Sequence, residues 1–338
     1  MMTRSRKRKS MGEYPKPSST HQDRQIDPQS GSPFFRLPSE LRNQIYMILF
    51  SSTRLTFTEK NPPRTRSGRA QLEPRKLFAP KNSLAILRSC QRIHEETKFL
   101  WLSNIELSFD YVEDLMDKLT TLPQSILGQI RFLRTGARPA RSSSFYERRM
   151  SLQVIWGLRG LRLDTLTLLA GTGPETAYDV DGFIWRGKGS KEFHFISHSS
   201  EILAFSPDDD DDLGPPMYRR KPQPATWHNN LLRRDGQDSG ASVVIYRSTL
   251  PGVQGSVLNP RTREPFRQTV SSLEQLDNFG LTEDQELLGP DEKSKEVLIV
   301  VKRGRGADIN ESDTRRPKDD SHNLAEWQHF KMRAMIED

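Results

Sequence analysis

Cys90 and His94 are the pair of side chains in this sequence that comes nearest to a nucleophile and its base. They are four residues apart, a spacing that brings two side chains together on one face of a helix. A histidine placed in this way can activate a thiol for covalent catalysis. A reactive thiolate also needs exposure, whereas Cys90 falls in an apolar helical stripe where core packing is the favoured interpretation. With no orienting third group evident, the sequence predicts no catalytic residue and no enzyme.

Metal ligands are suggested by spacing but not by context. His194 and His198 have the i, i+4 spacing of two ligands on a helix. The aromatic and aliphatic residues around His194 predict a strand instead, and no cysteine pair or further histidine completes a site. The five consecutive aspartates at 208–212 lack the spaced ligands and the bidentate glutamate of a calcium loop. We therefore expect no bound metal.

Two glycine-rich segments have part of a phosphate-binding pattern. Gly171 and Gly173 follow a predicted strand, but the third glycine of a dinucleotide fingerprint would fall at Thr176. The segment 187–190, Gly-Lys-Gly-Ser, has glycine where a P-loop needs serine or threonine after its lysine. Ordinary turns explain both segments, so the sequence predicts no cofactor.

Nucleic acid is the main alternative partner, because the net charge is +7 and binding to phosphates follows charge. The basic residues concentrate in segments 4–9, 59–82, 131–149, 219–234 and 302–316. No helix-turn-helix, zinc finger or RNA-stacking motif accompanies them. This leaves open a basic nuclear protein that binds nucleic acid non-specifically. The first cluster is also a candidate nuclear import signal, or else a solubilising tail, and comprises Arg4, Arg6, Lys7, Arg8 and Lys9. We expect the protein in the nucleus or the cytoplasm.

The elements that must position any functional residue begin with a helix at residues 38–49. Pro38 suits the first helical position and Glu40 the first turn. An apolar stripe recurs at helical spacing and consists of Leu37, Leu41, Ile45, Ile48 and Leu49. A helix this short is not stable alone in water. It must pack on its own domain or on another protein, and the spacing does not decide which.

The same residues carry a resemblance to a known family. The pattern Leu37-Pro38-x-Glu40-Leu41-x-x-x-Ile45-Tyr46-x-x-Leu49 resembles the opening of an F-box, and more closely that of fungal F-box-like proteins such as those of the two-E-x-R domain. Glu40-Leu41-Arg42 supplies an E-x-R, and the segment 87–96, with Leu87, Cys90, Ile93 and Glu96 at fixed spacing, is similar to the second helix of that group. The resemblance covers about residues 34–110.

The resemblance implies a substrate adaptor of a ubiquitin ligase that docks onto a linker subunit. The residues implied as docking anchors, or alternatively as internal packing, are Leu37, Pro38, Leu41, Ile45 and Leu49. On this basis we expect a non-enzymatic protein–protein interaction protein with a protein partner. The docking interpretation fails if the stripe is buried against Cys90 and Ile93 of the second helix.

Composition and periodicity bound the fold. Hydrophobic residues make up 34% of the chain and charged residues 28%, with 22 prolines, so sizeable parts should be solvated loop or disordered. A single cysteine excludes an internal disulfide, and no apolar run is long enough to span a membrane. Alternating patterns predict a mixed α/β fold with a partly parallel sheet. The predicted strands are 54–58, 105–109, 130–134, 164–169, 192–196, 241–248 and 296–302, and the predicted helices 83–102, 111–121, 145–159 and 323–336.

These patterns divide the chain into five parts. Residues 1–33 are a disordered basic tail, and residues 34–206 are an F-box-like helical module with an α/β domain. An acidic and proline-rich loop at 207–240 separates these from the strands of the same domain at 241–302. Residues 303–338 are a polar tail that could end in a helix.

Overall fold

The computed structural model describes residues 31–59, 77–78, 84–136, 160–170, 182–185, 187–203, 223–266 and 289–307, and the single positions 155, 158, 180 and 309. The predicted import cluster at 4–9, the aspartates at 208–212 and the predicted helix at 323–336 lie outside these residues, as does almost all of the predicted helix at 145–159. Among the described residues, no helix combines the length and the apolar character that a membrane crossing requires.

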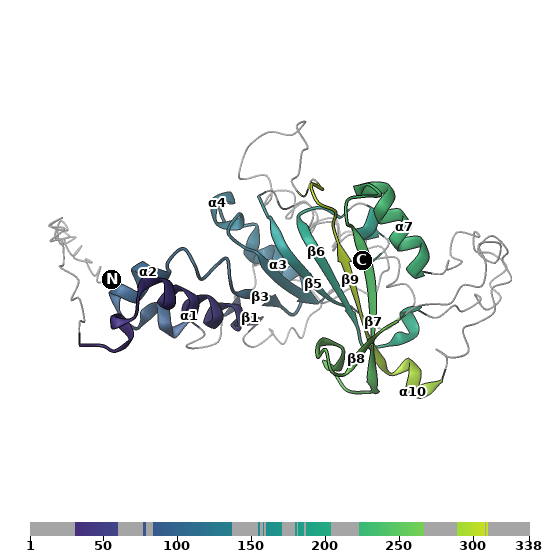
Figure 1. The fold of residues 1–338 in the computed structure, drawn as a ribbon, viewed down its shortest axis with the longest axis horizontal. Helices are drawn as coiled ribbons and strands as arrows, with labels where there is room; N and C mark the ends of the chain where they lie inside the picture. Colours follow the sequence, from purple (N-terminus) through teal and green to yellow (C-terminus); the bar gives the residue numbers. More distant parts are fainter. Residues whose placement is uncertain are drawn as a thin grey trace, which may run out of the picture.

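One mixed sheet organises the described residues (Figure 1). Its nine strands follow the order β2-β1-β3-β4-β5-β6-β9-β7-β8. The strands are β1 (Arg54–Glu59), β2 (Leu77–Phe78), β3 (Glu106–Phe109), β4 (Phe132–Gly136), β5 (Leu163–Ala170), β6 (Ser190–Ser197), β7 (Ser242–Pro251), β8 (Arg263–Pro265) and β9 (Lys295–Lys302). Strands β1, β3, β4, β5 and β6 are parallel to one another. The following pairs, β6 with β9, β9 with β7 and β7 with β8, are antiparallel. The predicted mixed α/β fold is confirmed.

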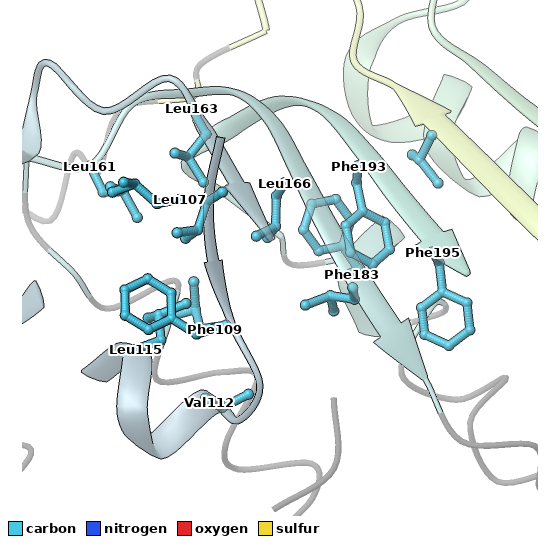
Figure 2. Packing of buried hydrophobic residues seen from close by; sticks show 14 of the residues in the cluster. Leu107, Phe109, Val112, Leu115, Leu161, Leu163, Leu166, Phe183, Phe193 and Phe195 are labelled. Carbon is cyan, nitrogen blue, oxygen red and sulfur yellow. The ribbon is translucent and has the colours of Figure 1, made fainter. Parts of the chain in front are cut away.

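Buried side chains from the central strands and the helices beside them form the main core (Figure 2). The rings of Phe183 and Phe193 stack with their centroids 3.7 Å apart. Leu107 and Phe109 of β3 meet the helix that follows that strand, where Leu115 is fully buried. Along β5 and β6, buried apolar residues such as Leu166 and Phe193 alternate with half-exposed polar residues such as Thr165 and Glu192, so the core lies mainly on one face of these strands.

Helices and short 3-10 turns connect the strands. The α-helices are α1 (Ser39–Ser51), α2 (Gln91–Thr97), α3 (Val112–Leu119), α4 (Gln124–Leu127), α7 (Gln223–Asp235) and α10 (Pro290–Lys293). The 3-10 turns are η1 (Phe34–Arg36), η2 (Ala85–Arg88), η3 (Ser200–Leu203) and η5 (Ser256–Leu258). α3 packs against β3 and β4, and α7 packs against β7.

Two sequence predictions are wrong in the described residues. The continuous helix predicted for 83–102 is broken at Cys90, whose extended backbone separates η2 from α2. The loop predicted for 207–240 contains α7, a helix whose Trp227 and Leu231 are fully buried. The sequence of α7 has few apolar residues, so it shows no clear helical periodicity. The helix is stabilised by packing of its few apolar residues against the rest of the fold. The strand predicted at 130–134 starts two residues later, at Phe132.

Candidate protein-docking site

Helix α1 presents a buried face that is partly polar. Arg42, Tyr46 and Phe50 are spaced four residues apart, and they are 7%, 0% and 1% exposed. A spacing of four residues places side chains one above the other on a helix. α1 and α2 lie together at one end of the molecule, beyond the β1 side of the sheet (Figure 1). The face of α1 that turns toward its own domain is therefore not the apolar stripe that the sequence displays.

The apolar stripe of α1 lies on the surface. Its exposed side chains are Leu41 at 46%, Ile45 at 42%, Ile48 at 69% and Leu49 at 39%, and Met47 of the same helix, outside the stripe, is 44% exposed. Single exposed apolar residues are ordinary, but several on one short helix are characteristic of a binding surface. Of the other two residues predicted as docking anchors, Leu37 is half-buried and Pro38 is exposed. Pro38 precedes the helix, with ψ at 149°, rather than occupying its first turn.

A carboxylate on α2 holds the polar face of α1. Glu96 accepts hydrogen bonds from Arg42 Nη2 at 2.7 Å and Nε at 3.1 Å, and from the Tyr46 hydroxyl at 2.9 Å. This paired geometry of guanidinium and carboxylate is among the strongest that proteins use. We call Arg42, Tyr46 and Glu96 the clamp. The clamp fixes the rotation of α1 about its axis, and that rotation leaves the stripe outside.

Two aromatic rings, those of Phe34 and Phe35, pack against the clamp and its neighbour Arg92. The Arg92 side chain reaches Glu96 at 3.3 Å and stacks over the Phe35 ring at 4.4 Å. Phe34 meets the Tyr46 ring edge-on, with centroids 5.7 Å apart. A cation over an aromatic face is attracted by the ring quadrupole. η1, which carries both phenylalanines, thus packs against the clamp and not against the stripe.

Cys90 acts as a cap and not as part of a helical stripe. Its Sγ accepts a hydrogen bond from the Ile93 amide at 3.5 Å, in the position of an N-cap before α2. The Nδ1 atom of His94 lies 3.2 Å from the Leu87 carbonyl oxygen. The first turn of α2 leaves amides without helical partners, and the thiol supplies one acceptor. The prediction of an apolar helical stripe through Cys90 is therefore wrong. The thiol has a structural role as the cap of α2.

The remaining sequence candidates do not converge. His194 Nε2 lies 3.4 Å from Glu192, whereas His198 Nδ1 lies 2.9 Å from Glu296, so the two histidines serve different partners. In the part of the chain that the structure describes, no group of three His, Cys, Asp or Glu side chains is arranged to hold a metal. Gly187 and Gly189 lead into strand β6, whereas a P-loop leads into a helix.

The clamp residues were not predicted as a functional set. Arg42 and Tyr46 stood in the sequence at a spacing of four, and Phe50 continues the series. That series was the available indication of a second, buried face, but its partner is 50 residues away along the chain. No protein-family model, curated protein or solved structure matches this chain. The F-box-like resemblance therefore remains a prediction, and function has to be argued from the geometry.

Acid should weaken the clamp. Burial alone would raise the pKa of Glu96, but the hydrogen bonds from Arg42 and Tyr46 outweigh it and hold the pKa below its ordinary value of 4.5. A carboxyl with a lowered folded-state pKa adds stability above its unfolded pKa and loses it as the pH falls through the folded value. We expect amide exchange in α1 to accelerate relative to α3 below about pH 4.5. A Glu96→Gln variant should lack this acid step, and equal protection of α1 down to pH 3 would contradict the assignment.

Proposed function

We propose that this protein is a non-enzymatic interaction protein that docks another protein through the exposed stripe of α1. The observation that carries the proposal is the exposure of Leu41, Ile45 and Ile48, at 46%, 42% and 69%, on a helix whose other face is clamped. Fully burying an exposed aliphatic side chain is worth about 1.5–3 kcal/mol, so a half-exposed one would contribute about half of that when a partner covers it. Because α1 is already held in position, binding does not pay the conformational entropy of ordering this helix.

The stripe indicates the chemistry of its partner. No charged residue occurs between Arg42 and Arg54, so the surface offers aliphatic contacts without a charge requirement. This composition fits recognition of a helix by an apolar groove. The resemblance of residues 34–110 names one such partner, a linker subunit of a ubiquitin ligase, and makes the protein a substrate adaptor. Both the adaptor role and the linker subunit belong to the proposal.

Truncation of the stripe tests the proposal. In the variant Leu41→Ala/Ile45→Ala/Ile48→Ala, we expect binding to a purified linker subunit to fall at least about 100-fold, because three aliphatic anchors are lost. Stability should fall by less than about 2 kcal/mol, since Leu41 and Ile45 are only about half exposed, Ile48 is mostly in solvent and alanine favours helix. Calorimetric titration measures the affinity, and thermal unfolding measures the stability.

A matched control separates the stripe from general surface apolarity. Trp185 is 44% exposed and lies elsewhere in the chain, so Trp185→Ala should bind like the wild type. Unchanged binding of the triple variant would refute docking through α1. If the linker subunit binds neither protein, the ligase part of the proposal is refuted. The nucleic-acid alternative predicts retention on duplex DNA that falls steeply with salt and is indifferent to the triple variant.

A further inference from the structure

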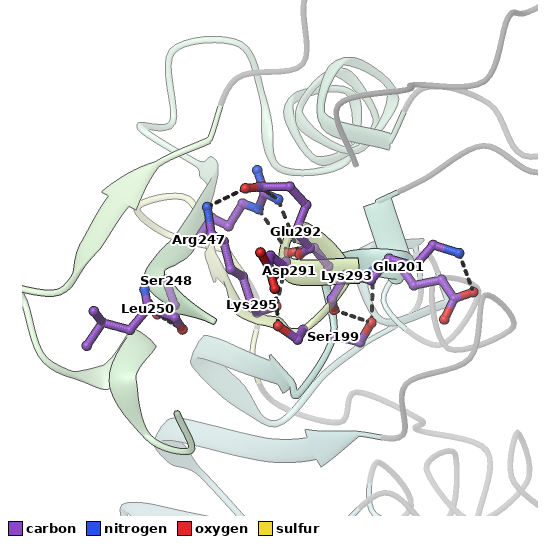
Figure 3. A network of polar contacts seen from close by, with 11 residues as sticks. Ser199, Glu201, Arg247, Ser248, Leu250, Asp291, Glu292, Lys293 and Lys295 are labelled. Atoms are coloured by element: carbon purple, nitrogen blue, oxygen red, sulfur yellow. Dashed lines mark hydrogen bonds and ion pairs between the residues drawn. The ribbon is translucent and has the colours of Figure 1, made fainter. Parts of the chain in front are cut away.

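A second set of exposed aliphatic side chains lies on the connection between β7 and β8. Leu250, Val253 and Leu258 are 40%, 48% and 41% exposed. They belong to residues 250–262, which we call the β7–β8 loop. Figure 3 shows Leu250 pointing away from the polar network of Arg247 and Glu292. Loops that carry exposed apolar side chains on a fixed scaffold are frequent binding elements.

A pair of hydroxyls holds the β7–β8 loop in one shape. Ser248 Oγ and Ser256 Oγ lie 2.7 Å apart. The first donates to the Leu250 carbonyl at 3.1 Å and the second contacts the Val253 carbonyl at 2.6 Å. Gly252 and Gly255 adopt positive φ, at 69° and 78°, which lets the chain turn tightly between these contacts. The backbone beneath two of the exposed side chains is therefore tied together.

A buried carboxylate anchors the far side of the loop. Glu296, only 2% exposed, accepts a hydrogen bond from the Val257 amide at 3.2 Å and lies 3.4 Å from Ser256 Oγ. Val257 is itself fully buried against Ile196 and Leu298. A loop built in this way loses little conformational entropy when a partner binds. The exposure of its three aliphatic residues is thus a fixed property of the surface.

The charges of the loop are of one sign. Residues 250–262 contain Arg261 and no aspartate or glutamate, and Arg263 and Glu264 follow in β8. The Arg263 guanidinium stacks over the Tyr246 ring at 4.4 Å. The adjacent segment 290–295, which includes α10 and the first residue of β9, adds no net charge, because Asp291 and Glu292 are balanced by Lys293 and Lys295. Glu292 is also paired with Arg247 (Figure 3). An aliphatic surface bordered by arginine complements apolar side chains flanked by carboxylates.

The β7–β8 loop is remote from α1. β1, next to α1, and β7 are separated by six strand intervals in the sheet order, which corresponds to about 29 Å at the usual strand spacing. A protein bound at α1 therefore need not cover the loop. The properties of the loop do not depend on the docking proposed for α1.

We propose that the β7–β8 loop is a second docking surface, and that it binds a short peptide segment of another protein in which aliphatic side chains stand next to aspartate or glutamate. Leu250, Val253 and Leu258 contact the aliphatic side chains, and Arg261 and Arg263 face the carboxylates. With α1 engaged elsewhere, such a protein holds two partners at once.

A peptide array tests the second surface on the full-length protein. The probes are 12-residue peptides with a central Leu-Leu pair flanked by Asp, by Ser or by Lys. We expect the Asp-flanked peptides to bind at least tenfold more tightly than the Lys-flanked ones. Val253→Ser/Leu258→Ser and Arg261→Glu should each lower that binding at least tenfold, and the triple alanine variant of α1 should leave it unchanged.

Several results would overturn this inference. They are absence of binding to every peptide, equal binding of Asp- and Lys-flanked peptides, or retention of binding in Val253→Ser/Leu258→Ser. A labelled single-stranded oligonucleotide forms the competing arm. If it binds and only Arg261→Glu abolishes its binding, the loop binds nucleic acid and the peptide assignment is wrong. Thermal unfolding confirms that each variant is folded, and Val253→Ser alone, at a position 48% exposed, replaces the double variant if that one unfolds.

Discussion

Replacement of Asp235 by alanine is expected to lower the free energy of unfolding by about 3–5 kcal/mol, the usual consequence of removing one partner from a buried ion pair. Asp235 ends α7, and its side chain is 1% exposed. It accepts hydrogen bonds from Arg303 Nε at 2.7 Å and Nη2 at 2.8 Å, and from the Gly304 amide at 2.9 Å. These bonds join α7 to the end of β9.

The loss is large because two cations depend on one carboxylate. Arg234 Nε lies 3.8 Å from Asp235 Oδ1, and the Arg303 side chain is only 5% exposed. Burial, followed by repulsion from Arg303, lowers the pKa of Arg234 to about 10. The site therefore already carries excess positive charge in the native protein. Without Asp235, the buried Arg303 guanidinium and the partly buried Arg234 guanidinium, which both donate to the Gly187 carbonyl, keep only backbone carbonyls as acceptors.

Chemical denaturation of three variants measures this effect. Asp238→Ala is the matched control, because Asp238 is exposed in the turn after α7 and should change stability by no more than about 0.5 kcal/mol. Asp235→Ala/Arg303→Leu should recover part of the loss, since it removes one of the stranded charges. A loss below about 1 kcal/mol in Asp235→Ala would show that solvent reaches the pair more freely than its burial implies.

Glu96→Ala is expected to release α1 and to cost about 2–4 kcal/mol. The replacement leaves the Arg42 side chain, 8% exposed, without its carboxylate and removes the acceptor of the buried Tyr46 hydroxyl. The expected value lies below that of a fully buried pair because the Glu96 side chain is 21% exposed. The pKa of Tyr46 is raised, first by burial and then by its hydrogen bond to Glu96, so this hydroxyl remains a donor at neutral pH.

A neighbouring glutamate provides the control for this variant. Glu95 pairs with Lys98 at the surface, with the two side chains 46% and 39% exposed, and pairs of this kind contribute little. Glu95→Ala should therefore leave stability and docking unchanged. Hydrogen exchange should show faster opening of residues 39–51 in Glu96→Ala alone, together with weaker binding at the stripe. Faster exchange throughout the sheet instead would mean that the clamp supports the whole fold and does not specifically orient α1.

The strands were the most predictable part of this protein. Predicted strands at 54–58, 105–109, 192–196 and 296–302 agree with β1, β3, β6 and β9 to within two residues at each end. Alternating apolar and polar residues, or a short apolar run as in 296–302, identify strands locally, without knowledge of their neighbours. Their order in the sheet, with β9 inserted between β6 and β7, depends on pairings between distant segments, about 100 residues apart for β6 and β9 and about 50 for β7 and β9.

Predictions from local sequence were wrong for two elements whose structure depends on distant contacts. Helix α7 was missed because its two fully buried apolar residues, Trp227 and Leu231, gain their meaning only from the sheet beneath them. Cys90 was assigned to a continuous stripe, although its extended backbone ends one element and begins the next. In the first case tertiary contacts formed a helix where the composition predicted a loop, and in the second they broke a helix that the apolar spacing predicted.

The sequence by itself predicted the helix at residues 38–49, which the structure shows at 39–51, because apolar residues at helical spacing are a local property of the chain. It also indicated that this helix needs a partner surface. Only the tertiary structure decided which face is satisfied within the chain. Arg42 and Tyr46 can be buried solely because Glu96, more than 50 positions from Arg42 in the sequence, supplies the acceptor that offsets their desolvation. That long-range ion pair turns the aliphatic stripe outward, where another protein can reach it.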